Sequence, residues 1–214
     1  MTRGGWALVC VFSASALAQE ATPGPDLRDV MYSRDLGMGA YHSLGYGSES
    51  INANPATLSL YKHYEIDLGG SYDITRGYGF AGASISDSQT AEWAMGLSYH
   101  FVSYGGDERR WAHVTTAAFA LPIANLVHLG AAVKHHFISG SNSSNSVTMN
   151  AGVAVHLFDL VSVGFSAQNV IGVYNRDIPR YFIASASAQL FNQLTPAVDV
   201  RMDFNNPSAR VSVS

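Results

Sequence analysis

The side chains best suited to metal binding or proton transfer are eight histidines. His135 and His136 are adjacent, so on an extended strand they would point to opposite faces and could not bind one ion together. His128 would share a face with His136 but lies several residues away along the same strand. No H-E-x-x-H or comparable ligand spacing occurs. The sequence therefore predicts no metal site, and we expect these rings to form hydrogen bonds in a polar interior.

A set of serine, histidine and acid could be assembled from His100, His113, Asp67 and Ser98. Nothing separates these residues from other polar ones, and no G-x-S-x-G motif occurs. We therefore do not expect an enzyme, and no motif calls for a cofactor. The charged residues are expected instead to face a wet lumen and to pair across it. These are Glu65, Asp67, Asp73, Glu92, Lys134, Asp199, Arg201 and Asp203.

Length and charge narrow the class of protein. A chain of 214 residues has room for one domain of ordinary size. The net charge is −4 and charged residues make up 13% of the chain, so no basic patch indicates a nucleic-acid partner.

The first 18 residues have the pattern of a secretory signal peptide. Arg3 gives a positive start, residues 6–14 are mostly apolar, and a small-x-small site ends at Ala18 before Gln19. We expect cleavage between Ala18 and Gln19. The single cysteine, Cys10, lies in the segment that would be removed, so the exported chain is expected to contain no disulfide.

From about residue 62 to the end, apolar and polar residues alternate with a period of two. Such a period places one kind of side chain on each face of a strand. No run of about 18 apolar residues follows the signal segment, which excludes a helical membrane protein. We count about ten strands, the last at residues 209–214. The plainest runs are residues 63–73, 92–101, 127–134, 147–157, 161–168 and 198–204.

Two features favour lipid rather than a soluble core against the apolar faces. The polar faces are rich in Gly, Ala and Ser, and aromatic residues such as Tyr64, Trp93 and Trp111 lie near expected strand ends. From the third expected strand on, short and long links alternate, which predicts short periplasmic turns, longer outer loops and a periplasmic position for residues 36–60. Short links are expected near residues 87–89, 122–125, 158–159 and 192–193, and longer ones near 103–110, 139–146 and 172–179.

The segment before the first strand is rich in Gly, Ser and Asn. It contains Leu-Gly-Met-Gly-Ala-Tyr at 36–41 and Asn-Pro-Ala-Thr-Leu at 54–58. These stretches resemble the start of FadL-type barrels and their PorV/PorQ-like relatives. Ala40, Ala53 and Thr57 depart from the family pattern. The motif residues are Gly37, Met38, Gly39, Asn54, Pro55 and Ala56.

The resemblance implies a 14-strand barrel whose N-terminal segment folds inside it as a hatch. It implies uptake of hydrophobic molecules for FadL-type members, and a role in protein secretion or surface attachment for PorV-like members. The residues themselves support a packed segment outside the sheet, because Gly37 and Gly39 permit tight turns and Pro55 cannot join a central strand. An ordinary periplasmic extension is the alternative.

We therefore expect an all-β protein, an antiparallel transmembrane β-barrel of the bacterial outer membrane. Residues 1–18 would be the signal peptide, 19–60 a hatch-like segment and 61–214 the barrel. Its partners would be membrane lipid and a small hydrophobic molecule that passes through it. A PorV-like scaffold or shuttle and a soluble periplasmic β-protein are the alternatives. Alternation continues to Ser214, so a truncated chain and a narrower ten-strand barrel both stay open.

Overall fold

The computed structural model describes residues 44–45, 47–74, 77–104, 110–123, 126–140, 143–157, 160–172, 178, 180–190, 196–203 and 209–213. The expected signal peptide and the residues Gly37, Met38 and Gly39 therefore lie outside the described part of the chain. Within the described part, no helix is long and apolar enough to span a membrane.

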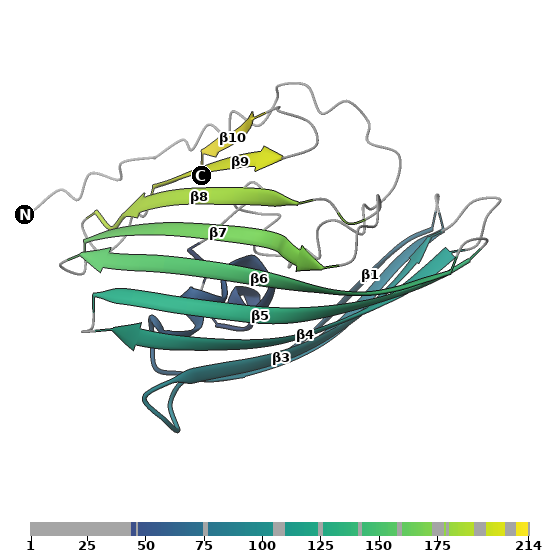
Figure 1. Cartoon of the computed structure of the whole chain (residues 1–214), viewed down its shortest axis with the longest axis horizontal. Coiled ribbons are helices and arrows are strands. Elements are labelled where there is room, and N and C mark those ends of the chain that lie inside the picture. The colour runs from purple at the N-terminus through teal and green to yellow at the C-terminus, as the bar shows by residue number, and fades with distance from the viewer. Residues whose placement is uncertain are drawn as a thin grey trace, which may run out of the picture.

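The chain folds into one antiparallel sheet in which each strand pairs with the next, in the order β1 to β10. The expected all-β, antiparallel class is confirmed (Figure 1). The strands are β1 (Tyr64–Asp73), β2 (Tyr78–Asp87), β3 (Ala94–Tyr104), β4 (Arg110–Ile123), β5 (Val127–Ser139), β6 (Ser144–Leu157), β7 (Val161–Gly172), β8 (Tyr181–Ala188), β9 (Ala197–Asp203) and β10 (Ala209–Val213).

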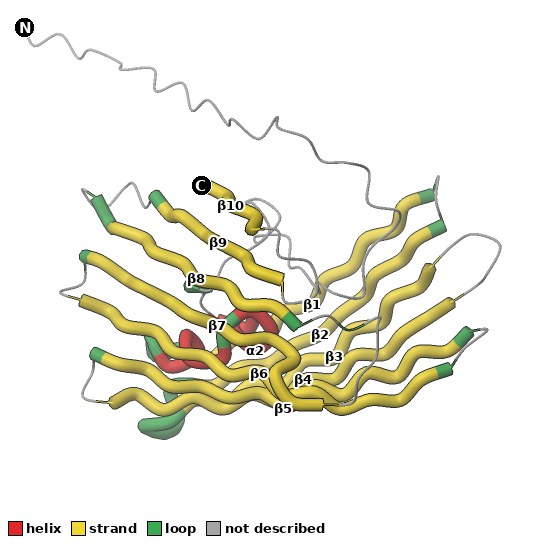
Figure 2. The backbone as a smooth tube through the Cα atoms, turned by 45° about the horizontal axis from the view of Figure 1, so that its top comes forward, coloured by secondary structure: helices red, strands yellow, loops and turns green. Residues whose placement is uncertain are grey.

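The sheet curves into a trough, and three short helices lie in its hollow (Figure 2). These are η1 (Gly47–Glu49), α2 (Ser50–Ala53) and η2 (Pro55–Ser59), and we call residues 47–59 the inner segment. No ladder joins β1 to β10 among the described residues, so the sheet has two edges. We call the end of the sheet where the inner segment leads into β1 the entry end, and the opposite end the far end.

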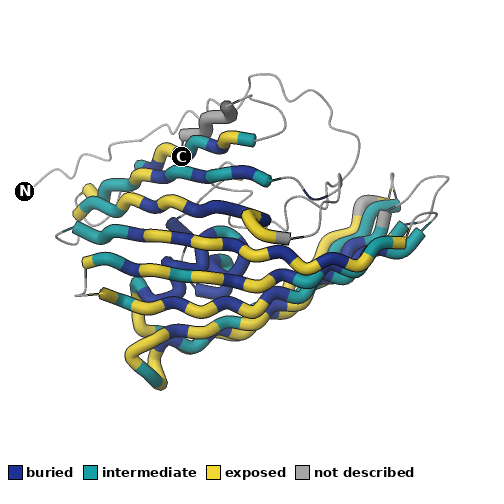
Figure 3. Tube along the Cα trace, viewed as in Figure 1, coloured by how far each residue is buried: buried dark blue, intermediate teal, exposed yellow. Residues whose placement is uncertain are grey.

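Buried and more exposed residues alternate along most of the strands (Figure 3). On β4, for example, Ala112, Val114 and Thr116 are buried on the concave face, whereas Trp111 and Phe119 are exposed on the convex one. This is the expected period of two.

The expected sorting of links by length is wrong. Residues 88–93 join two strands at the entry end, whereas residues 105–109 and 140–143 join strands at the far end, so lengths at the two ends overlap. The reason is that ladder pairing extends the strands into segments expected to be loops, as in the pair Ile138 and Ser144. The expected tight turn near residues 192–193 is also wrong, because residues 189–196 separate β8 from β9.

Strand β7 contains a bulge that the pattern did not predict. Its register with β6 shifts between Met149 and Ala151, and Asn169 adopts the left-handed conformation with φ of 55°. Asn tolerates this conformation better than most residues. The bulge turns the consecutive side chains of Gln168 and Asn169 into buried positions, both facing the inner segment's side of the sheet.

Candidate functional site

The inner segment packs on a surface of small side chains near the entry end. Ile51 and Leu58 are fully buried and form one apolar cluster with alanines of β3, β4 and β5. Glycines occupy the positions where the strands come closest to the inner segment. We call these residues the small-residue floor: Ala94, Gly96, Ala118, Ala120, Gly130, Ala132 and Gly152.

Three glycines of the floor leave room for the inner segment. A Cβ atom at any of these positions would collide with the segment. At Gly130 a Cβ would lie 2.2 Å from the Ala56 backbone nitrogen and 2.3 Å from the Pro55 carbonyl carbon. At Gly152 it would lie 1.9 Å from Asn54 Oδ1, and at Gly96 2.5 Å from Ile51 Cγ1. Backbone therefore rests directly on backbone at Gly130.

The Asn54-Pro55-Ala56 motif has a clear local role. Asn54 caps η2, because its Oδ1 accepts a hydrogen bond of 3.1 Å from the Ala56 backbone nitrogen. Pro55 occupies the first position of that helix, where its missing N–H is no loss. The Asn54 Nδ2 also donates to the Val153 carbonyl at 3.3 Å. The motif thus shapes the inner segment and fixes it to β6.

Polar side chains hold α2 against the sheet on two sides. Asn52 Nδ2 donates to Ser98 Oγ at 3.1 Å, and Thr116 Oγ1 donates to Asn52 Oδ1 at 2.8 Å. From the bulged strand, Ser166 Oγ and Gln168 Nε2 both donate to the Ala53 carbonyl, at 2.6 and 2.7 Å. The last carbonyl of the short helix is therefore satisfied by the sheet.

The two ends of the inner segment are fastened as well. The Ser48 backbone nitrogen donates to Glu65 Oε2 of β1 at 2.9 Å. Ser59 Oγ lies 2.8 Å from His128 Nδ1 of β5. Lys62, just after the segment, donates to the Ala91 carbonyl at 2.7 Å.

Beyond the inner segment, toward the far end, the concave face becomes polar. Ser84, Ser98, Thr116, Lys134 and Thr148 lie side by side across five strands, and His100 and His136 follow in the next row. All seven side chains are buried. We call these seven residues the polar belt.

The polar belt gives way to a small apolar cluster nearer the far end. It comprises Val102, Ala112 and Ile138, with Phe80 packed against it. The Phe80 ring stacks on His100, with centroids 5.4 Å apart.

The expected lumen charges are distributed unevenly. Lys134, Asp199 and Arg201 are buried on the concave face. Arg201 Nε lies 3.0 Å from Asp203 Oδ1 on the same strand, and its guanidinium lies 3.9 Å from the centre of the Tyr181 ring. This ion pair is made along one strand and does not join two strands.

The other expected charges lie on the edge strand β1 or in the link before β3. Asp67 is half-buried on β1, and Glu65 binds Ser48 as described above. Glu92 is exposed and lies in the bend before β3, because that strand begins at Ala94. The strand start expected near residue 92 is therefore wrong. The Asp73 side chain lies outside the described residues.

Within the residues that the structure describes, no three His, Cys, Asp or Glu side chains are grouped to hold a metal ion. His135 and His136 do point to opposite faces: His135 bonds Asn145 on the convex side, and His136 is buried with its Nε2 3.4 Å from Thr148 Oγ1. Of the four residues considered for catalysis, Ser98 and His100 lie on the concave face and His113 on the convex face.

The hydrogen bonds of Asn52, and those of Gln168 and Asn169, were not predicted from the sequence. The last two interrupt the alternation of β7, since two polar residues follow each other at 168–169. That break in the period was a usable sign of a bulge. Asn52 carries no such sign, because its partners lie on β3 and β4.

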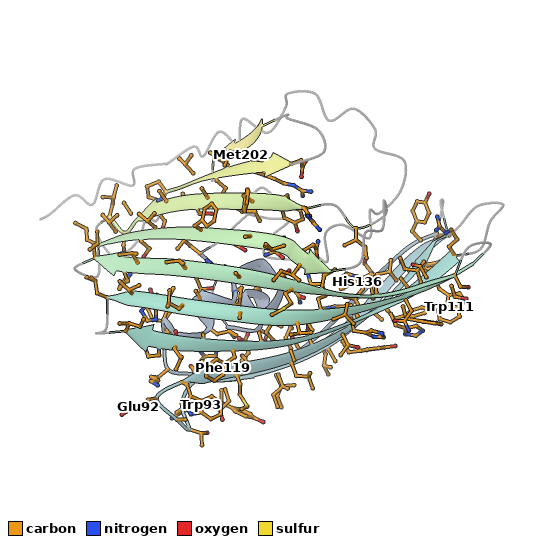
Figure 4. The ribbon with its side chains drawn as sticks, viewed as in Figure 1. Glu92, Trp93, Trp111, Phe119, His136 and Met202 are labelled. Atoms are coloured by element: carbon orange, nitrogen blue, oxygen red, sulfur yellow. The ribbon has the colours of Figure 1, made fainter. Side chains whose placement is uncertain are left out.

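The convex face is apolar over most of its area. Leu68, Leu97 and Val133 are exposed there at 75%, 51% and 45%. Aromatic side chains gather toward both ends: Trp93 and Phe119 near the entry end, and Trp111 near the far end (Figure 4). Trp111 and Phe119 are eight residues apart on β4, which corresponds to roughly 26 Å along the strand.

Comparison with protein-family models, curated proteins and solved structures gives no match for this chain. The resemblance to FadL-type and PorV-like barrels therefore stays a prediction.

Proposed function

We propose that this chain is a β-barrel protein of a bacterial outer membrane, in which the inner segment obstructs the passage of a small hydrophobic molecule. The observation that carries the proposal is the contrast between the two faces of one sheet. The convex face exposes apolar side chains, whereas the concave face carries the polar belt and is occupied by the inner segment.

The convex face has the character of a surface that meets lipid. Soluble monomeric proteins rarely expose apolar patches above a few hundred Å². Here the exposed side chains of Leu97, Val133 and Met149 lie in one row across β3 to β6, with Ala117 of β4 between the first two. Outer-membrane barrels have an apolar band about 25 Å tall between two aromatic girdles. The positions of Trp93, Phe119 and Trp111 agree with such a band.

A membrane location restricts the two edges of the sheet. An unpaired strand edge is strongly disfavoured in hydrocarbon, because its N–H and C=O groups find no partner there. The proposal therefore requires that the outer edges of β1 and β10 be paired in the membrane.

The apolar cluster near the far end supports a hydrophobic solute. Val102 and Ile138 face the concave side with Phe80, beyond the polar belt. A molecule entering from the far end would meet this cluster before it reached the inner segment.

The membrane location is tested by Val133→Arg, in the middle of the convex face. An arginine at the bilayer midplane destabilises a barrel by about 2–4 kcal/mol, and by about 0–1 kcal/mol near the interface. In water, an exposed substitution usually changes stability by less than about 0.5 kcal/mol. We expect the larger loss, measured by denaturant unfolding of the protein in lipid vesicles.

Ser139→Arg is the matched control, since Ser139 lies on the same strand and face at the far end. Equal, small effects of the two arginines would argue for a soluble sheet, as would recovery of the protein in the periplasmic fraction without detergent. A difference in gel migration between unboiled and boiled samples would identify a heat-resistant barrel.

Passage is tested separately with the hydrophobic dye N-phenyl-1-naphthylamine. Cells whose outer membrane contains the protein should take up the dye faster than cells without it. Asn52→Ala, which loosens the inner segment, should increase uptake further. Unchanged uptake in both would contradict passage and would favour a scaffold role.

A further inference from the structure

Two polar atoms on the concave face are buried side by side without a hydrogen-bond partner. His136 of β5 (Figure 4) and Ser146 of β6 lie directly opposite each other in the ladder, and each is only 3% exposed. Among the residues that the structure describes, none bonds His136 Nδ1 or Ser146 Oγ. Buried polar groups in native proteins are nearly always paired, so these two atoms point to a partner from outside the sheet.

Thr148 determines which ring nitrogen of His136 carries the proton. Thr148 Oγ1 donates its only proton to Asn169 Oδ1 at 2.9 Å. The same oxygen lies 3.4 Å from His136 Nε2, so this long hydrogen bond must be donated by the ring. A neutral imidazole has one N–H, which leaves Nδ1 as an acceptor. The Ser146 hydroxyl beside it can both donate and accept.

The unpaired atoms adjoin the apolar cluster near the far end. The four residues of that cluster pair directly from β2 to β5 and form one row: Phe80, Val102, Ala112 and Ile138. Ile138 is buried two residues beyond His136 on the same face of β5. At about 4.8 Å between neighbouring strands, the row extends over roughly 14 Å. One end of an apolar row thus meets an acceptor and a hydroxyl.

This arrangement selects among the head groups of amphiphilic molecules. An ionised carboxylate only accepts hydrogen bonds, so it cannot bond His136 Nδ1. An ammonium group can donate, but a buried charge is far more costly than a buried hydroxyl. An alcohol satisfies both atoms, because its hydroxyl can donate to His136 Nδ1 and accept from Ser146 Oγ.

We propose that His136 and Ser146 bind the hydroxyl group of an alkyl alcohol whose chain lies along the apolar row. The inference rests on the proposed passage of a small hydrophobic molecule, and it assigns that molecule a chemical class. The solute is uncharged and has a hydroxyl at one end.

The test compares three ligands that share an alkyl chain and differ in the head group. These are 1-octanol, octanoate and octylamine, each titrated by calorimetry into the full chain folded in dodecyl maltoside. At about pH 8 the carboxylate and the amine are both charged. Titration into detergent without protein gives the heat of partition into micelles, which is subtracted.

We expect 1-octanol to bind about tenfold more tightly than octanoate or octylamine, which corresponds to about 1.4 kcal/mol. His136→Phe removes the acceptor and keeps an aromatic ring, and Ser146→Ala removes the hydroxyl. Each should weaken 1-octanol binding by about threefold to tenfold, the usual effect of one hydrogen bond. Octanoate makes no bond to Nδ1, so His136→Phe should leave its affinity unchanged.

His135→Phe is the matched control. His135 is the next residue of the same strand, but it bonds Asn145 on the convex side, so its loss should not change 1-octanol binding. A difference in gel migration between unboiled and boiled samples shows that each variant is folded. If His136→Phe does not fold, Ser146→Ala decides the outcome.

Equal affinity of the parent and both site variants for 1-octanol would overturn the site, and would mean that the two atoms hold only water. Tighter binding of octanoate or octylamine would overturn the assigned head group. Faster dye uptake by cells together with either result would leave the proposed passage intact. Unchanged dye uptake would contradict passage, whereas a preference for 1-octanol that depends on His136 and Ser146 would still support the binding site.

Discussion

The two parts of the concave face differ although the same strands form both. The small-residue floor is made of Gly and Ala, and the inner segment rests on it. The polar belt lies one to two rows farther along β3 to β6 and carries Ser, Thr, His and Lys side chains. Both parts occupy the same inward positions of the alternating pattern.

The difference shows that side-chain size, as well as polarity, determines where the inner segment binds. At Gly130 and Gly152 even a methyl group would overlap the segment. The belt consists of larger side chains, and two of them, Ser98 and Thr116, bond Asn52 of the inner segment. The floor therefore fixes position by shape, and the belt contributes hydrogen bonds at its border.

The largest effect should come from adding a methyl group to the floor. Gly130→Ala places a Cβ 2.2 Å from backbone nitrogen of Ala56, and backbone cannot rotate away as a side chain could. Overpacking of this kind typically costs about 1–3 kcal/mol. For a chain of this size that is several degrees of midpoint temperature, at about 2–4 °C per kcal/mol. The midpoint can be followed by heat-modifiable migration.

Gly69→Ala is the control for this prediction. Gly69 lies on β1, and a Cβ there would meet nothing within 4 Å. Alanine is better than glycine in a strand interior by roughly 0.5–1 kcal/mol, so this variant should be as stable as the parent or slightly more so. If Gly130→Ala behaved like Gly69→Ala, the inner segment would not be seated on the floor.

The second effect concerns the border between floor and belt. Asn52→Ala removes two buried hydrogen bonds, to Ser98 and from Thr116. At about 0.5–1.5 kcal/mol for each bond, the loss should be about 2 kcal/mol. Denaturant unfolding of Asn52→Ala, Ser98→Ala and the double variant would measure it. The double variant should lose less than the sum of the two, and strict additivity would mean that the pair does not interact.

The alternation made the fold class, the strand positions and the facing of most residues predictable. The position of Pro55 outside the sheet was also predictable, because proline cannot join a central strand, and η2 does begin at Pro55. Contacts between distant segments were not predictable. Nothing near Gly130 or Gly152 in the sequence shows that Pro55 and Asn54 approach them.

The lengths of the links between strands were not predictable for a related reason. Residues 139–146 contain five serines and two asparagines, a composition typical of loops, yet Ser139 and Ser144 belong to strands β5 and β6. Pairing with a neighbouring strand overrides the local preference of such residues. The same override hides the register of the bulge at Asn169 until β6 is placed beside it.

A smaller effect is expected where the inner segment leaves the floor. Ser59→Ala and His128→Phe each remove the 2.8 Å contact between Ser59 Oγ and His128 Nδ1. Each should lose about 1 kcal/mol, the usual contribution of one hydrogen bond. The double variant should be no less stable than the worse single variant. Unfolding midpoints of the three proteins would measure this. If the losses of the two single variants added up in the double variant, the Ser59 hydroxyl and the His128 ring would not interact.

The smallest effect should come from the belt itself, at Ser84. Its hydroxyl is buried, yet within the described part of the chain it has no hydrogen-bond partner. Truncating a buried hydroxyl that makes no bond removes an unsatisfied polar group, so it loses no interaction. Ser84→Ala should therefore change the unfolding free energy by less than about 0.5 kcal/mol, and any change should be stabilising. A loss of unfolding free energy near that of Asn52→Ala would mean that Ser84 also stabilises the inner segment. The belt would then hold the segment over its whole width and not only at its border with the floor.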